Sequence, residues 1–98
     1  MIRIIAKRTI VEFYKKYPDA KVYLETWYDT VRQAEWENPQ QIKDFYATVS
    51  ILKGSRVVFN LKGNTYRLVT KINYQKHWLY IRFIGTHKEY DKINAETI

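Results

Sequence analysis

Three stretches in the second half of the chain alternate between apolar and polar residues and are joined by short polar links. They run from Arg56 to Leu61, from Thr65 to Asn73 and from Trp78 to Ile84. An alternation with a period of two is typical of strands that bury one face. Links as short as Gly63-Asn64 and Gln75-Lys76 indicate hairpins, so we expect a three-stranded antiparallel meander.

The alternation gives this meander two chemically different faces. The apolar face, which would form a wall of the core, carries Val57, Phe59, Leu61, Tyr66, Leu68, Thr70, Ile72, Leu79, Ile81 and Phe83. The polar face carries Arg56, Val58, Asn60, Arg67, Val69, Lys71, Asn73, Trp78, Tyr80 and Arg82. The expected cross-strand neighbours are the pairs Asn60–Arg67, Lys71–Tyr80 and Val69–Arg82.

The first half of the chain has helical periodicity, preceded by a short apolar run from Ile2 to Ile5 that predicts a strand joining the meander. The spacing of Thr9 and Glu12 is that of a capping box and predicts a helix that ends before Pro18. Apolar residues at intervals of three and four then predict a second helix that continues to about Glu37.

Asn38 and Pro39 indicate the start of a third, short helix, because they suit the N-cap and the first helical position. This helix would end at about Tyr46. Together the elements predict an α+β fold in one domain over residues 1–98. Two N-terminal helices would pack on one face of a small antiparallel-rich sheet, with the functional face opposite.

Positive charge is concentrated in the predicted meander. The net charge is +7 and the pI is about 9.6, and no Asp or Glu occurs between Phe45 and Lys88. Like charges on one sheet face repel each other unless an anion or solvent screens them. This pattern favours a polyanionic partner over the alternative of an ordinary solvated face.

A second group of basic residues lies on the predicted helices. These residues either contact another polyanionic surface or simply solvate the helices. They are Lys7, Arg8, Lys15, Lys16 and Lys21.

The composition excludes several classes of site. Cysteine is absent, so the chain has no disulfide and no thiolate metal site, and two histidines are too few for a zinc centre by themselves. No apolar run approaches the roughly 18 residues that a membrane span needs, and the N-terminus does not resemble a signal peptide. We therefore expect a cytoplasmic protein with no metal, no cofactor and no membrane partner.

The stretch from Thr86 to Asp91 follows the last predicted strand and has two interpretations. In the first interpretation the stretch has only a structural role: Thr86 and Glu89 have capping-box spacing, which predicts a short capped helix. The same residues also supply an imidazole, an ammonium group and a phenol, which are general acid/base groups.

These groups suit metal-free cleavage of RNA, which carries its own nucleophile in the 2′-hydroxyl. His87 would act as base or acid, because imidazole titrates near neutral pH. Arg67 and Arg82 would hold the phosphate with forked donors. Lys88 and Tyr90 are further candidates, although such groups ordinarily titrate at about pH 10 and need cationic surroundings to exchange protons at neutral pH.

The rest of the RNA would lie along the polar face of the meander. There we expect amide and cationic groups to position the strand and aromatic rings to stack on unpaired bases. The residues expected to contact RNA in this way are Arg56, Asn60, Asn64, Lys71 and Tyr80.

Three stretches of the sequence resemble a known family. The stretches from Phe59 to Val69, from Tyr80 to Arg82 and from Thr86 to Asp91 are similar to the HigB toxin family of the RelE/ParE superfamily. Lys16-Tyr17-Pro18 and Asn38-Pro39 lie where the two N-terminal helices of that family end. One departure is that RelE-type toxins have a lysine pair ahead of the second strand, where only Lys53 and Arg56 occur here.

The resemblance implies a type II toxin that cleaves mRNA on the translating ribosome. It also implies a cognate helix-turn-helix antitoxin resembling HigA, through which alone the toxin would reach operator DNA. The basic helix residues would then contact ribosomal RNA. Two alternatives stay open from the sequence, a ParE-like gyrase poison without catalysis and a plain RNA-binding module, although His87 beside an arginine-bearing face favours cleavage.

Overall fold

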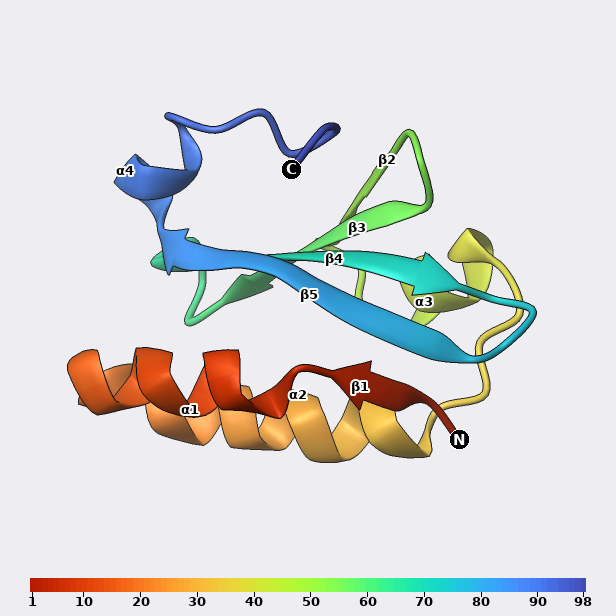
Figure 1. The fold of residues 1–98 in the computed structure, drawn as a ribbon, viewed down its shortest axis with the longest axis horizontal. Helices are drawn as coiled ribbons and strands as arrows, with labels where there is room; N and C mark the ends of the chain where they lie inside the picture. Colours follow the sequence, from red (N-terminus) through yellow and green to blue (C-terminus); the bar gives the residue numbers. More distant parts are fainter.

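A five-stranded sheet is covered on one face by helices in this computed structural model, which describes residues 1–98 (Figure 1). The elements in chain order are β1 (Arg3–Ile5), α1 (Lys7–Lys16), a 3₁₀ turn η1 (Pro18–Ala20), α2 (Lys21–Gln33), α3 (Pro39–Phe45), β2 (Ser50–Leu52), β3 (Arg56–Leu61), β4 (Tyr66–Asn73), β5 (Trp78–Thr86) and α4 (His87–Tyr90). The strand order is β1-β5-β4-β3-β2, with β1 parallel to β5 and all other neighbours antiparallel. The predicted α+β fold is confirmed. None of the helices is long and apolar enough to cross a lipid bilayer.

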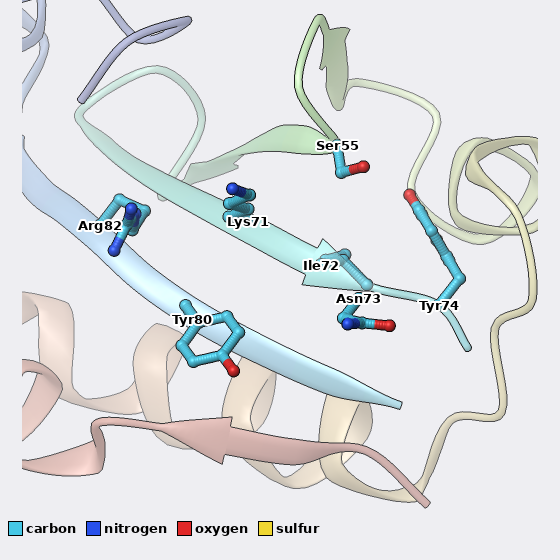
Figure 2. Close-up of a pocket in the computed structure, with 7 residues that line it drawn as sticks. All are labelled: Ser55, Lys71, Ile72, Asn73, Tyr74, Tyr80 and Arg82. Carbon is cyan, nitrogen blue, oxygen red and sulfur yellow. The ribbon is translucent and has the colours of Figure 1, made fainter. Parts of the chain in front are cut away.

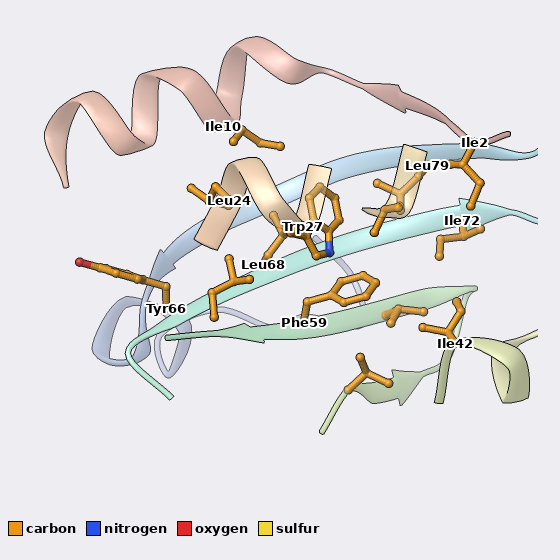
Figure 3. Packing of buried hydrophobic residues seen from close by; sticks show 14 of the residues in the cluster. Ile2, Ile10, Leu24, Trp27, Ile42, Phe59, Tyr66, Leu68, Ile72 and Leu79 are labelled. Atoms are coloured by element: carbon orange, nitrogen blue, oxygen red, sulfur yellow. The ribbon is translucent and has the colours of Figure 1, made fainter. Parts of the chain in front are cut away.

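The core lies between the helices and the apolar face of the sheet (Figure 3). Helix α2 contributes Leu24, Trp27 and Val31, which are almost completely buried. The ring of Trp27 meets that of Phe59 on β3 edge to face, with centroids 5.3 Å apart. These side chains recur every three to four residues on α2 and every two on the strands, which is why the periodicity of the sequence predicted the layers.

Two helix boundaries differ from the prediction. Helix α1 begins at Lys7, two residues before Thr9, so the predicted capping box at Thr9 is wrong. Glu12 instead pairs with Arg8, one turn earlier, at 2.8 Å. Helix α2 ends at Gln33 rather than near Glu37, because the chain becomes extended at Ala34 and turns Trp36 into the core.

The third helix confirms its predicted start. The Asn38 side chain accepts a hydrogen bond from the backbone N–H of Gln41 at 3.0 Å, and Pro39 is the first helical residue. This cap satisfies one of the donors that a helix N-terminus leaves unpaired.

The register of β4 and β5 contains a bulge that the sequence prediction missed. The pairs Asn60–Arg67 and Lys71–Tyr80 are confirmed, but Val69 pairs with Phe83 and Thr70 with Ile81. The predicted pair Val69–Arg82 is therefore wrong, because Arg82 is an extra residue in β5. The bulge also moves Phe83 to the polar face, where it packs with Val58 and Val69.

The C-terminal residues cover the middle of the polar face, on the side away from α1 and α2 (Figure 1). Ala95, 7% exposed, packs against Val58 and Val69, which are fully buried. The Arg56 guanidinium donates hydrogen bonds of 3.1 and 2.7 Å to the carbonyl oxygen of Ile98. Arg56 is only 8% exposed, so the expectation that it lies open on a basic face is wrong.

A cluster around Asp19 connects the helical layer to the turn between β3 and β4. The Asp19 carboxylate accepts hydrogen bonds from Lys62 Nζ at 2.7 Å and from the Tyr66 hydroxyl. The hydrogen bond from Lys62 lowers the pKa of Asp19, and the same bond raises the pKa of Lys62. Burial, followed by the hydrogen bond to Asp19, raises the pKa of Tyr66 to about 12.

We expect Asp19→Asn to destabilise the protein at neutral pH by an amount that disappears in acid. The pKa of Asp19 is lower in the folded protein than in the unfolded chain, so its contribution is present above about pH 4. It is lost as the pH falls through the folded-state pKa. Urea unfolding of both proteins at pH 7 and pH 3 checks this, with Glu12→Gln as an exposed ion-pair control. An equal difference in unfolding free energy at both pH values would contradict the coupling.

Candidate functional site

Helix α4 is held firmly at the end of β5 by the capping box that the sequence predicted. Thr86 Oγ1 accepts from the Glu89 N–H at 3.2 Å, and Glu89 Oε1 accepts from the Thr86 N–H at 2.8 Å. The hydrogen bond from the Thr86 N–H lowers the pKa of Glu89. The backbone N–H of His87 also donates to the Thr65 carbonyl at 3.1 Å, which places α4 beside the start of β4.

The position of α4 brings Tyr90 over Arg67. The guanidinium carbon of Arg67 lies 5.1 Å from the centroid of the Tyr90 ring, a cation–π distance. Arg67 pairs across the sheet with Gly85, where an added Cβ would lie 2.6 Å from the ring of Phe83 and 3.1 Å from Glu89 Oε1. A glycine is thus required at this position to let α4 and Phe83 pack closely.

Arg67 retains hydrogen-bonding capacity that the protein does not use. Its Nε is buried and has no partner. The neighbouring Asn60 donates through Nδ2 to the Thr48 carbonyl at 2.9 Å, while its Oδ1 is buried and unpaired. Buried polar groups are nearly always hydrogen-bonded in native proteins, so these two neighbouring groups need a partner, for which bound water suffices.

His87 is oriented by a residue that the sequence interpretation did not single out. Its Nδ1 lies 3.2 Å from Asp91 Oδ2, and both side chains are about half exposed. A carboxylate that accepts from Nδ1–H leaves Nε2 free to exchange a proton with a substrate. The spacing of four residues on a helix was the signal that could have identified Asp91.

A second group of predicted residues gathers at the other end of the β4–β5 hairpin. Lys71, Tyr80 and Arg82 line an open cleft of about 560 Å³ (Figure 2). The remaining lining residues are Ser55, Ile72, Asn73 and Tyr74. Ser55 and Tyr74 lie outside the predicted strands, so sequence alternation gave no signal for them.

The two arginines that were predicted to hold one phosphate occupy different positions along the β4–β5 hairpin. Arg67 lies opposite Gly85, whereas Arg82 is the bulged residue beside the Val69 and Thr70 positions. The apolar group that includes Val69 and Phe83 lies between them. Arg67 therefore belongs with α4, and Arg82 belongs with the cleft.

The other predicted contact residues are distributed over the molecule. Asn64 is exposed in the turn between β3 and β4, and Lys88 is exposed on α4. The basic helix residues Lys7, Arg8, Lys15, Lys16 and Lys21 lie on α1 and at the start of α2, in the helical layer. Three of these residues place their ammonium groups over tyrosine rings, 4.7 to 5.8 Å from the ring centroids. They are Lys7, Lys16 and Lys21.

Comparison with known proteins identifies the family of the chain. Residues 20–93 match the family model of HigB toxin, described as the RelE-like toxic component of a toxin–antitoxin system. The mRNA interferase toxin HigB of Escherichia coli (strain K12) is 28% identical over 96 residues, which cover 96% of this chain and 92% of that protein. The mRNA interferase HigB of Escherichia coli O6:H1 is 24% identical over 94 residues, which cover 94% and 91%. The chain therefore belongs to the HigB toxin family, the toxic component of a system in which an antitoxin is its partner.

Proposed function

We propose that this chain is a ribosome-dependent mRNA interferase that uses the 2′-hydroxyl of the RNA as nucleophile and needs no metal ion. The observation that carries the proposal is the group formed by Arg67, Tyr90 and the His87–Asp91 pair at the junction of β4, β5 and α4. Family membership and relatives named mRNA interferase support it.

The chemistry requires two proton transfers and stabilisation of the phosphoryl group. The 2′-oxygen attacks the adjacent phosphorus while the bond from phosphorus to the 5′-oxygen breaks, which leaves a 2′,3′-cyclic phosphate and a 5′-hydroxyl. A base removes the proton of the 2′-hydroxyl, and an acid protonates the departing 5′-oxygen. His87 Nε2 supplies one of these transfers, and Tyr90 or Lys88 supplies the other.

Arg67 stabilises the negative charge that develops on the phosphoryl group in the transition state. Its forked N–H donors match two phosphate oxygens, a geometry that a lysine does not reproduce. Tyr90 holds the guanidinium from one side by the cation–π contact. A preorganised cation of this kind stabilises charge that develops in the transition state.

The shape and charge of the chain support dependence on the ribosome. The acid/base group on α4 is open to solvent, so the toxin alone makes few contacts that would align a 2′-hydroxyl with its phosphate. Alignment of reacting groups supplies roughly 7 to 11 kcal/mol in well-oriented systems. We propose that the ribosome supplies this alignment, while Lys7, Arg8, Lys15, Lys16 and Lys21 bind ribosomal RNA.

The antitoxin partner is proposed to be a HigA-like helix-turn-helix protein whose acidic residues cover basic residues of the toxin. The stretch between Phe45 and Lys88 has no acid to compete with such residues. Complementary charges accelerate association, and salt weakens the effect.

We expect cleavage of ribosome-bound mRNA to be much faster than cleavage of the same mRNA free in solution. Purified protein is assayed on one mRNA, free and in a programmed ribosome, with a chelator present throughout. His87→Ala serves as the inactive control, and Glu35→Gln as a control on the far side of the molecule. Equal rates on both substrates would contradict ribosome dependence, and loss of all activity with chelator would contradict the metal-free mechanism.

A further inference from the structure

The cleft at the far end of the β4–β5 hairpin has the chemistry of a nucleotide site. Its lining combines the cations of Lys71 and Arg82 with the ring of Tyr80, and all three side chains belong to β4 or β5 (Figure 2). Lys71 and Tyr80 are direct cross-strand partners. The bulge adds Arg82 as an extra residue of β5, and its side chain lines the same cleft.

The charge in this cleft is uncompensated. None of the four ion pairs of the molecule includes Lys71 or Arg82, and no acidic residue lines the cleft. Burial raises the pKa of Tyr74, so this lining residue stays neutral and adds no opposing charge. Two cations without a counter-ion on one sheet surface favour an anionic ligand.

Neutral polar groups beside the cations can form hydrogen bonds with the edge of a base. Asn73 Oδ1 accepts a hydrogen bond from the backbone N–H of Lys76 at 3.0 Å, which fixes the side chain and leaves its NH₂ group as the free donor. Ser55 adds a hydroxyl that can donate or accept. Stacking surface continues past Tyr80, since Trp78 meets it edge to face with centroids 6.3 Å apart.

Most of the cleft lies farther along the hairpin than the residues beside α4. Arg67 and Lys71 are four residues apart on β4, which corresponds to about 13 Å along a strand. The apolar group around Phe83 and the C-terminal residues lies between the two places. A ligand that reaches both must be a chain of several nucleotides.

We propose that this cleft is a second RNA subsite, which binds one unpaired nucleotide of the substrate strand at a distance from the bond that is cleaved. Tyr80 stacks on the base, Lys71 and Arg82 contact its phosphate, and Asn73 donates to the edge of the base. This subsite rests on the proposed RNA cleavage, because the strand must also reach Arg67 and His87. In this proposal the bulge at Arg82 serves to bind the RNA strand and takes no part in the chemical step.

The test compares RNA lengths by NMR, which detects weak binding. Isotope-labelled His87→Ala protein is titrated with a single-stranded hexanucleotide and with a dinucleotide at low salt. Both RNAs should shift the backbone amides of Lys71, Asn73 and Arg82, but the hexanucleotide should do so at lower concentration, because it alone can occupy the cleft and the α4 site together. Tyr80→Ala should weaken hexanucleotide binding about tenfold or more and abolish the amide shifts in the cleft with either RNA.

Arg82→Ala provides an independent readout of the phosphate contact. The dependence of log affinity on log salt should fall by about 0.7 for one lost contact to single-stranded RNA. Arg32→Ala and Tyr23→Ala, on α2, are the matched controls for charge and aromatic area and should change neither value.

Failure of the subsite can be distinguished from failure of the proposed function. If the wild-type protein cleaves mRNA while the hexanucleotide leaves the cleft amides unshifted, the subsite is refuted and the function stands. Equal affinity for the two RNA lengths also refutes it. If Tyr80→Ala and Arg82→Ala weaken the antitoxin complex but not RNA binding, the cleft belongs to the protein partner and the proposal is overturned.

Discussion

Replacing Arg67 with alanine should lower the rate of mRNA cleavage by about 10²- to 10³-fold while the fold stays intact. Loss of one preorganised donor to developing charge has an effect of this size in other enzymes. Arg67→Lys should restore little activity, because a single ammonium group cannot reproduce the forked donors. Stability should change modestly, since the buried Nε of Arg67 makes no hydrogen bond that the substitution would remove.

The measurement is single-turnover cleavage on programmed ribosomes, with circular dichroism as the check of folding. Arg32→Ala is the matched control, because it removes an exposed arginine from the opposite layer of the molecule. If the folded Arg67→Ala protein cleaves at the wild-type rate, other residues hold the phosphate and the role given to Arg67 is wrong.

The local parts of the fold could be predicted from the sequence because their signals are local. The predicted strand from Arg56 to Leu61 has the same bounds as β3. The pair Asn60–Arg67 follows from the length of the turn between the strands, and the caps at Asn38 and Thr86 follow from side-chain chemistry.

The features that were missed depend on tertiary contacts. Nothing in the local pattern shows that Arg82 is an extra residue, because a strand with a bulge still alternates on either side of it. Helix α2 ends early because burial of Trp36 outweighs the helical pattern around it. The polar tail gave no signal that Ala95 and Ile98 would cover the sheet and enclose Arg56.

The candidate site was predictable as a set of residue types but not as a geometry. His87, Tyr90 and Arg67 were singled out from their chemistry, yet the cation–π contact between Arg67 and Tyr90 joins residues from separate elements. The same limit applies to the positions of Arg67 and Arg82 along the hairpin. A bulge and an apolar group separate them, and neither is visible before the chain is folded.

Removing a single oxygen from the substrate should have the largest effect of all. An mRNA with 2′-deoxyribose at the nucleotide before the scissile phosphate has no 2′-hydroxyl to attack the phosphorus. His87 and Arg67 would still bind this mRNA, but no group on α4 can replace the missing nucleophile. Cleavage at that position should therefore fall below detection, whereas a 2′-deoxy substitution several nucleotides away should leave the rate close to that of the unmodified mRNA.

This substitution tests the central claim, that the toxin cleaves mRNA through the RNA's own 2′-hydroxyl. The two modified mRNAs and the unmodified one are compared on programmed ribosomes, and the ends of the products are identified by mass spectrometry. The account predicts 2′,3′-cyclic phosphate and 5′-hydroxyl ends from the unmodified mRNA and no product at the modified nucleotide. Undiminished cleavage at the 2′-deoxy position, with a 5′-phosphate on the product, would contradict it.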